Sequence, residues 1–206
     1  MKSDSLCLLG SVKKMTNEMN DGELLALAAA GDVSAFERLI VGYEKLIFSQ
    51  AYRMLGNACD ARDAAQESLI KIYCNIHKCH DIKSFKYWIR AITNNTCIDE
   101  LRKRKNRRED SLHRIYETQD GESSLQFEAP DATPEAELMT AEKQKLIQAA
   151  IDKLPPKYKS LVVLRDINGL SYEELSETTG LNMGTVKSRL SRARGRLRML
   201  LADEYG

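Results

Sequence analysis

The chain has 206 residues, with 31 basic and 30 acidic side chains and a formal net charge of +1 at pH 7. This length allows one large domain or two small ones, and an apolar content of 43% is enough for a packed core. No apolar stretch approaches the length needed to span a bilayer, and the N-terminus lacks the long apolar region of a secretory signal. Five cysteines, an odd number, argue against a secreted disulfide framework, so we expect a cytoplasmic protein with reduced thiols.

Hydrophobic periodicity predicts helices along the first part of the chain, with no alternating pattern long enough for a strand. The first helix runs from an N-cap at Asp21 to a C-cap at Gly31. In the second, apolar residues recur at steps of three and four from Phe36 onward, and the helix stops at Gly56. We expect residues 1–18 to be a disordered extension.

A third helix carries an acidic surface opposite its apolar stripe. Asp60, Asp63 and Glu67 are three and four residues apart and align on one side, with Gln66 beside them. We call these four residues the acidic ridge. A fourth helix, from about residue 84 to residue 104, has an apolar stripe that includes Trp88, which we interpret as a core residue.

The periodicity is lost between about residues 107 and 137, where acidic and proline residues predict a flexible linker. Helices resume over about 138–153, the sequence LPPKY interrupts them, and the next helix covers 156–167. The charges follow the same division. Residues 83–108 hold nine basic and two acidic residues, 109–137 hold nine acidic and one basic, and 183–198 hold six basic and no acidic residues. Two basic blocks around an acidic one predict two surfaces that face a polyanion.

The segment LSYEELSETTGLNMGTVKSRLSRARGRLRMLL, residues 170–201, predicts a helix-turn-helix. Ser171 and Glu174 form an S-x-x-E capping box, Gly180 supplies the left-handed residue of the turn, and Asn182 can cap the second helix. The core face of that helix consists of Val186, Leu190, Ala193 and Leu197. The opposite face and its flanks, which we call the basic face, carry small polar and basic residues suited to a DNA groove and its phosphates: Thr185, Lys187, Ser188, Arg189, Ser191, Arg192 and Arg194.

Residues 74–80 read CNIHKCH, which raises three interpretations: a zinc site, a redox device, or the end of a helix. Zinc needs four ligands that converge, usually from two separate turns. The adjacent Cys79 and His80 point apart in a continuing helix, and no second Cys or His pair occurs elsewhere. We therefore prefer a helix end followed by a loop over 77–83, with no metal, and leave open a reactive Cys79.

These segments together resemble the extracytoplasmic-function (ECF) group of bacterial sigma factors. DKLPPKYKSLVVLRDINGLSYEELSETTGLNMGTVKSRLSRARGRLR is similar to region four, in which the helix containing GTVKSRL reads the upstream (−35) promoter element. CDARDAAQESLIKIY resembles the D-x-x-D-x-x-Q-E segment that docks on RNA polymerase. SFKYWIRAITNNTCIDELRKRK resembles the segment that meets and melts the downstream (−10) element.

The resemblance implies an all-α chain with two helical domains, region 2 over residues 19–106 and region 4 over 138–206, joined by the acidic linker at 107–137. It implies a promoter-specificity subunit with no catalytic activity, cofactor or small-molecule substrate. Its partners would be promoter DNA, the beta-prime clamp and beta flap of core RNA polymerase, and an anti-sigma factor. The acidic ridge would bind core polymerase, and the basic face the −35 element. The residues expected to contact the −10 element are Lys78, His80, Lys83, Lys86 and Arg90.

Two other classes of protein remain as alternatives. A stand-alone helix-turn-helix regulator, dimerised through its N-terminal helices, would bind operator DNA tightly by itself, whereas a sigma factor binds poorly without core polymerase. The acidic ridge and the absence of a heptad seam favour the sigma factor. A metal-dependent enzyme would need a pocket with further ligands, and only His113 lies outside the CNIHKCH cluster.

Overall fold

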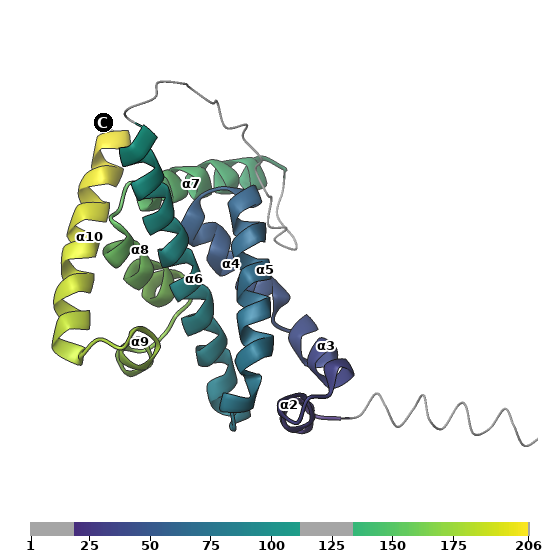
Figure 1. The fold of residues 1–206 in the computed structure, drawn as a ribbon. Coiled ribbons are helices and arrows are strands. Elements are labelled where there is room, and N and C mark those ends of the chain that lie inside the picture. Colours follow the sequence, from purple (N-terminus) through teal and green to yellow (C-terminus); the bar gives the residue numbers. More distant parts are fainter. Residues whose placement is uncertain (1–18, 112–133, 206) are drawn as a thin grey trace, which may run out of the picture.

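The computed structural model describes residues 19–111 and 134–205. Within these two ranges every regular element is a helix and none is a strand, which confirms the predicted all-α fold (Figure 1). The predicted extension at 1–18 and most of the predicted linker lie outside the described residues. None of the described helices combines the length and the apolar character needed to cross a membrane.

Residues 19–111, which we call the N-terminal half, fold into α-helices and one 3-10 turn. In chain order these are α2 (Asp21–Ala29), α3 (Val33–Val41), α4 (Glu44–Leu55), α5 (Ala58–Asn75), η1 (Ile76–Lys78) and α6 (Ile82–Ser111). Residues 134–205, the C-terminal half, comprise α7 (Pro134–Asp152), α8 (Pro156–Val162), the π-helical turn η2 (Val163–Ile167), α9 (Tyr172–Thr179) and α10 (Met183–Tyr205).

The first helix begins at a different cap from the predicted one. The side-chain oxygen of Asn20 accepts from the backbone N–H of Glu23 at 3.0 Å, and the Glu23 carboxylate accepts from the Asn20 N–H at 3.1 Å. This capping box makes Asn20 the N-cap and leaves Asp21 as the first helical residue. At the other end the C-cap is Ala30, and Gly31 follows it with a left-handed φ of 100°.

The prediction of one continuous second helix is wrong, because the structure has two helices, α3 and α4, in its place. The chain turns at Gly42 and Tyr43. Glycine is a poor helix former, and the ring of Tyr43 packs against residues outside α3 and α4. The Tyr43 ring meets Phe85 edge-on with centroids 5.1 Å apart, and the Tyr43 hydroxyl donates to Asp21 at 3.4 Å. Contacts with residues distant in sequence therefore decide this break.

The two helices that border the linker are both longer than predicted. α6 continues to Ser111 rather than ending near residue 104, and α7 begins at Pro134 rather than near residue 138. Lysine and arginine are good helix formers, which allows the basic end of α6 to continue the helix. Residues 107–111 and 134–137, predicted as linker, therefore belong to helices.

The core of the N-terminal half lies among α2, α3, α4, α5 and α6. Ile47, Ile72, Phe85 and Ile89 have no solvent exposure, and Trp88 is half-buried with its ring stacked on Phe85 at 6.0 Å between centroids. Burial of side chains of this size contributes about 1.5–3 kcal/mol each. The packing fixes α6 in position, and with it the basic side chains on its outer surface.

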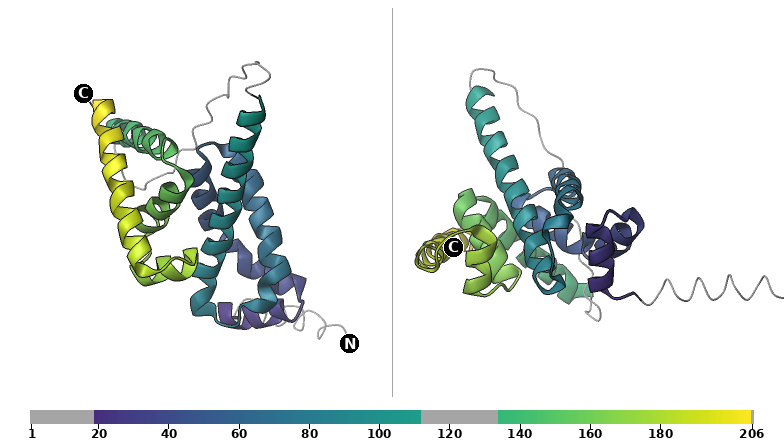
Figure 2. Two further views of the ribbon diagram at one scale, coloured as in Figure 1. Left: turned by 60° about the vertical axis from the view of Figure 1, so that its left-hand side comes forward. Right: turned by 60° about the horizontal axis from the view of Figure 1, so that its bottom comes forward.

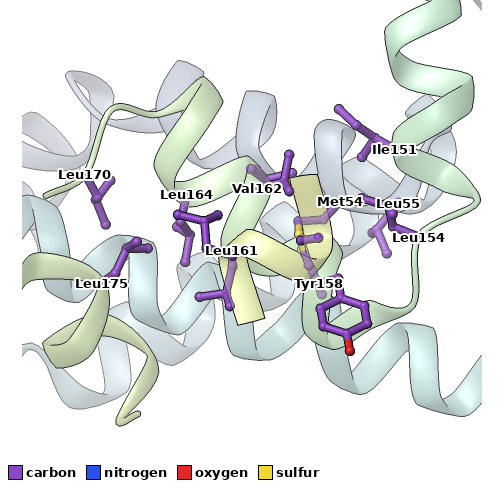
Figure 3. Packing of buried hydrophobic residues seen from close by; sticks show 14 of the residues in the cluster. Met54, Leu55, Ile151, Leu154, Tyr158, Leu161, Val162, Leu164, Leu170 and Leu175 are labelled. Atoms are coloured by element: carbon purple, nitrogen blue, oxygen red, sulfur yellow. The ribbon is translucent and has the colours of Figure 1, made fainter. Parts of the chain in front are cut away.

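A second apolar cluster joins the two halves of the molecule. Met54 and Leu55 of α4 pack with Ile151, Leu154 and other residues of the C-terminal half (Figure 3). In both views of Figure 2, α9 and α10 lie on one side of α6 and the N-terminal pair α2 and α3 on the other. The C-terminal half therefore covers one side of α6 and α4.

Candidate nucleic-acid interface and acidic ridge

The helix-turn-helix predicted from sequence is present at α9 and α10. The Ser171 hydroxyl accepts from the Glu174 N–H at 3.1 Å, and the Glu174 carboxylate accepts from the Ser171 N–H at 2.6 Å. Gly180 ends α9 in the left-handed region, with φ of 67°. Asn182 then accepts from the Thr185 N–H at 2.8 Å and caps α10. Both caps and the turn are thus confirmed.

The orientation of α10 follows its apolar stripe. Val186, Leu190 and Ala193 are at most 1% exposed and anchor the helix to α7, α8 and α9. On the basic face Lys187, Ser188, Ser191, Arg192 and Arg194 are exposed, whereas Thr185 and Arg189 are half-buried. The exposed serines leave room for the close approach of a groove, and the cations beside them can neutralise phosphates.

Two arginines of the basic face already have neighbours. Arg194 binds Asp166 through two contacts, Nε–Oδ2 at 3.2 Å and NH2–Oδ1 at 2.5 Å, and this carboxylate raises the pKa of Arg194. Arg189 lines a cavity of about 640 Å³ between the two halves, together with Asn94, Arg102 and Lys157. Sequence reasoning did not reveal either neighbour.

The residues expected at the −10 element fall into two groups. Lys78, His80, Lys83 and Lys86 are exposed around η1 and the first turns of α6. Lys78 Nζ donates to the side chain of Asn75 at 2.7 Å, which is compatible with a surface position. These four side chains form one basic surface at the end of the α5–α6 hairpin.

Arg90 lies apart from this group. It is 7% exposed, and its NH1 donates to the backbone carbonyl of Asn168 in the C-terminal half at 3.1 Å. Burial lowers its pKa. A contact between Arg90 and DNA therefore requires the C-terminal half to move away from α6.

The CNIHKCH segment spans the end of α5, the turn η1 and the start of a short loop. Cys74 is exposed on α5, whereas Cys79 is buried in the core of the N-terminal half, where its Sγ donates to the Asp81 carbonyl at 3.7 Å. Burial raises the pKa of the Cys79 thiol. The two cysteines face different environments, and in the described part of the chain no three His, Cys, Asp or Glu residues gather in an arrangement suited to a metal ion.

The acidic ridge lies on α5, but its members differ in their partners. Asp60 is half-buried and forms an ion pair with Arg104 of α6. Glu67 pairs with Lys71 at 2.7 Å, and the hydrogen bond from Lys71 lowers the pKa of Glu67. Asp63 and Gln66 are exposed.

Two apolar side chains that were not singled out from the sequence extend the exposed face of α5. Ile70 is 64% exposed and Tyr73 is 43% exposed. Ile70 is four residues after Gln66 and seven after Asp63, a spacing that places all three on one side of the helix. The helical spacing of these residues in the sequence could have revealed that Ile70 lies on the same face. This face of α5 therefore offers an apolar contact surface beside its charged residues.

Comparisons with known proteins agree with this geometry. Residues 39–107 match the family described as Sigma-70 region 2, and residues 144–197 match Sigma-70, region 4. The ECF RNA polymerase sigma factor SigW of Bacillus subtilis (strain 168) is 36% identical over 176 residues, which cover 84% of this chain and 92% of SigW. The chain belongs to the ECF sigma factors of RNA polymerase.

Other sigma factors show the same relationship. SigE of Mycolicibacterium smegmatis is 35% identical over 177 residues, which cover 84% of this chain but only 65% of the length of SigE. The fold is similar to that of the sigma factor RpoE from Bartonella quintana, solved in complex with the anti-sigma factor NepR. That match has a TM-score of 0.63 at 24% identity and covers 82% of this chain and 98% of RpoE. In this ECF sigma factor, most of α10 belongs to the region 4 match and α5 with most of α6 to the region 2 match.

Proposed function

We propose that this ECF sigma factor binds core RNA polymerase, recognises −35 and −10 promoter elements and assists promoter opening, without catalysing a reaction itself. In this proposal residues 19–106 dock on the polymerase and meet the −10 element, residues 138–206 read the −35 element, and 107–137 connect them. The protein works in the cytoplasm, with RNA polymerase. The observation that carries the proposal is the capped helix-turn-helix with exposed Ser188, Ser191 and Arg192 on one face of α10.

The −35 contact is supported by the chemistry of the basic face. An α-helix fits the major groove, where arginine can donate two hydrogen bonds to guanine and small residues permit close approach. We assign this contact to Thr185, Lys187, Ser188, Arg189, Ser191, Arg192 and Arg194. Arg194 would exchange its Asp166 partner for a phosphate.

The −10 contact is supported by the exposed basic surface at the start of α6. Lys78, His80, Lys83 and Lys86 can follow the backbone of a separated strand, since a positively charged surface attracts single-stranded DNA without reading every base. We assign Arg90 to the same contact, on the condition that the C-terminal half has moved. No metal or other cofactor takes part.

The polymerase contact is assigned to Asp60, Asp63, Gln66 and Glu67. The exposed Asp63 carboxylate is suited to a basic partner, which on the polymerase is the beta-prime clamp, and region 4 meets the beta flap. Asp63→Arg should abolish binding to core polymerase and preserve the helical content measured by circular dichroism. The matched control is Glu37→Arg on α3, an exposed acidic residue outside the ridge. Equal affinity of wild type and Asp63→Arg for core polymerase would reject this docking surface.

The structure of RpoE with NepR supports one further partner, because a chain of the same fold was solved with an anti-sigma factor. We propose that an anti-sigma factor also holds this protein inactive. Co-purification of a tagged chain from its native cells, followed by mass spectrometry, would identify it.

The central test is transcription in vitro from a genomic library with purified core polymerase, with and without this protein. A sigma factor creates start sites that depend on it, and these share −35 and −10 sequences. A stand-alone regulator instead binds duplex DNA tightly in the absence of core polymerase. Start sites that are identical with and without the chain would contradict the proposed function.

A further inference from the structure

The basic face of α10 is bordered on one side by the π-helical turn η2, which places a carboxylate against it. Asp166 of η2 binds Arg194 through two contacts, Nε–Oδ2 at 3.2 Å and NH2–Oδ1 at 2.5 Å. The side chains of Asp166 and Arg194 are 32% and 45% exposed, so the pair lies at the surface. A guanidinium binds a carboxylate and a phosphate through the same fork of N–H groups. Asp166 therefore occupies the donors that Arg194 would offer to DNA.

Three cations gather beside this carboxylate, around the ring of Tyr172. The guanidinium of Arg165 lies 5.0 Å from the ring centroid, and Lys187 Nζ lies 6.0 Å from it. Lys187 and Arg194 are seven residues apart, which places them on the same side of α10. Asp166 first, and Tyr172 after it, raise the pKa of Arg194. Asp166 thus lowers the charge of this group of side chains from three positive charges to a net two.

The ion pair opposes every phosphate that approaches Arg194. A surface ion pair is weak enough to be exchanged, because water screens both charges. An approaching phosphate must nevertheless either meet an Arg194 whose charge is already neutralised or displace the carboxylate of Asp166. The displaced carboxylate then lies beside the phosphate and repels it. This penalty is the same for any DNA sequence, because phosphates carry no sequence information.

The side chains suited to base contacts lie on another part of the basic face. Ser188, Ser191 and Arg192 are exposed and follow one another at steps of three and one residues. None of them is bonded to Asp166 among the described residues. A change at Asp166 should therefore alter the phosphate contact and leave the base contacts as they are. The two contributions to DNA binding can be measured separately.

We propose that Asp166 is an intramolecular competitor for DNA phosphate, which occupies Arg194 in the free chain and keeps the sequence-independent affinity of α10 for duplex DNA low. The proposal rests on the DNA-binding role proposed for α10 and deepens it, because it assigns a regulatory role to a residue outside the basic face. A phosphate that is held in place by the other contacts of a promoter complex can displace Asp166, whereas a phosphate met at random competes with it.

The test is the binding of the full-length protein, without polymerase, to a fluorescein-labelled DNA duplex of random sequence. Fluorescence anisotropy gives the affinity at salt concentrations from about 50 to about 200 mM. Asp166→Asn removes the charge and keeps the size of the side chain. This variant should bind about two- to fivefold more tightly, as expected for the loss of a competing surface ion pair. The slope of log affinity against log salt should steepen by about 0.9, the value for one added phosphate contact.

Glu173→Gln is the matched control, because Glu173 is an exposed carboxylate on α9 that does not contribute to the raised pKa of Arg194. It removes the same charge from the same half of the chain and should change the affinity and the slope less. In an Arg194→Gln background, Asp166→Asn should have no more effect than Glu173→Gln, because the cation that it releases is gone. A pair that only fastens η2 to α10 would instead lower the urea midpoint in Asp166→Asn without strengthening DNA binding.

Circular dichroism establishes that each variant remains helical, and Asp166→Ala replaces Asp166→Asn in the same assay if the latter loses helix. The proposal is overturned if the folded variant binds no more tightly than wild type, or gains no more than Glu173→Gln, or shows no binding at about 50 mM salt. These results concern the free chain only. Transcription that depends on this protein and core polymerase, together with unchanged DNA binding in Asp166→Asn, would reject the role of Asp166 and leave the proposed function intact.

Discussion

The substitution Gly56→Ala should destabilise the protein far more than the same change at another left-handed glycine. Gly56 ends α4 with φ of 82°, a backbone conformation that costs other residues about 1–2 kcal/mol. A Cβ at Gly56 would lie 2.4 Å from Oδ2 and 2.9 Å from Oδ1 of Asp152 in the C-terminal half. The carboxylate would have to move.

Movement of Asp152 has a further cost. Its Oδ1 accepts from Lys159 Nζ at 3.0 Å and from Gln148 Nε2 at 3.1 Å, and the Lys159 side chain is only 4% exposed. Loss of a hydrogen bond to a buried charged group costs about 1.5–3 kcal/mol. Together with backbone strain, the expected loss in the free energy of unfolding for Gly56→Ala is about 2.5–5 kcal/mol.

Gly180→Ala is the matched control. Gly180 is also left-handed, with φ of 67°, but nothing lies within 4 Å of the position its Cβ would take. Gly180→Ala should therefore lower the free energy of unfolding only by the cost of backbone strain, about 1–2 kcal/mol. Equilibrium unfolding in urea, followed by circular dichroism, measures both variants and wild type under identical conditions.

The contribution of Asp152 can be isolated in a double-mutant cycle. In the Asp152→Ala background, Gly56→Ala should cost no more than Gly180→Ala, because the clashing carboxylate is gone. If Gly56→Ala and Gly180→Ala lower the free energy of unfolding equally in the otherwise wild-type chain, the Asp152 carboxylate does not clash with a Cβ at position 56. The close approach of Asp152 to Gly56 would then add nothing to the cost of Gly56→Ala.

Three further predictions concern reactivity, DNA contact and pH. Burial, and secondarily Glu67, raises the pKa of Cys97 to about 12. A thiol reagent should therefore modify Cys97 at least about 100-fold more slowly than the exposed Cys59, and peptide mass spectrometry can measure the two rates. Arg192→Ala should reduce transcription from −35-dependent promoters about tenfold in vitro while affinity for core polymerase stays unchanged. Hydrogen bonds, first from Tyr87, lower the pKa of Glu174, so this carboxylate stabilises the fold above its ordinary pKa of 4.5 and the contribution is lost as pH falls. Tyr87→Phe should therefore narrow the difference between urea midpoints at about pH 7 and about pH 3, and an unchanged difference would exclude this linkage.

Local signals explain why much of the fold was predictable. The capping box of Ser171 and Glu174, the turn at Gly180 and the cap at Asn182 each depend on residues within a few positions, and all form as expected. The apolar stripe of α10 is equally local, since helical spacing alone places Val186 with its buried neighbours.

Features that depend on distant partners were not predictable from one sequence. The break at Tyr43 is set by Phe85, which lies on another helix. Arg90 has the charge and position of a DNA contact, yet its burial results from Asn168 beyond the linker. The pairing of Arg194 with Asp166 joins residues 28 positions apart, and no periodicity encodes such a pair.

The π-helical turn η2 affects how the chain leads from α8 to α10, the helix that we propose to read DNA. A π turn accommodates one more residue than an α-helical turn, and one residue corresponds to about 100° of rotation around a helix. At this turn the N–H groups of Asn168 and Leu170 bond to the carbonyls of Val163 and Leu164, and the chain then enters α9 and α10. Deletion of one residue from 163–167 would shorten the path from α8 to α9 by one residue, so α9 would meet α8 in a changed register even though the apolar stripe of α10 stays the same.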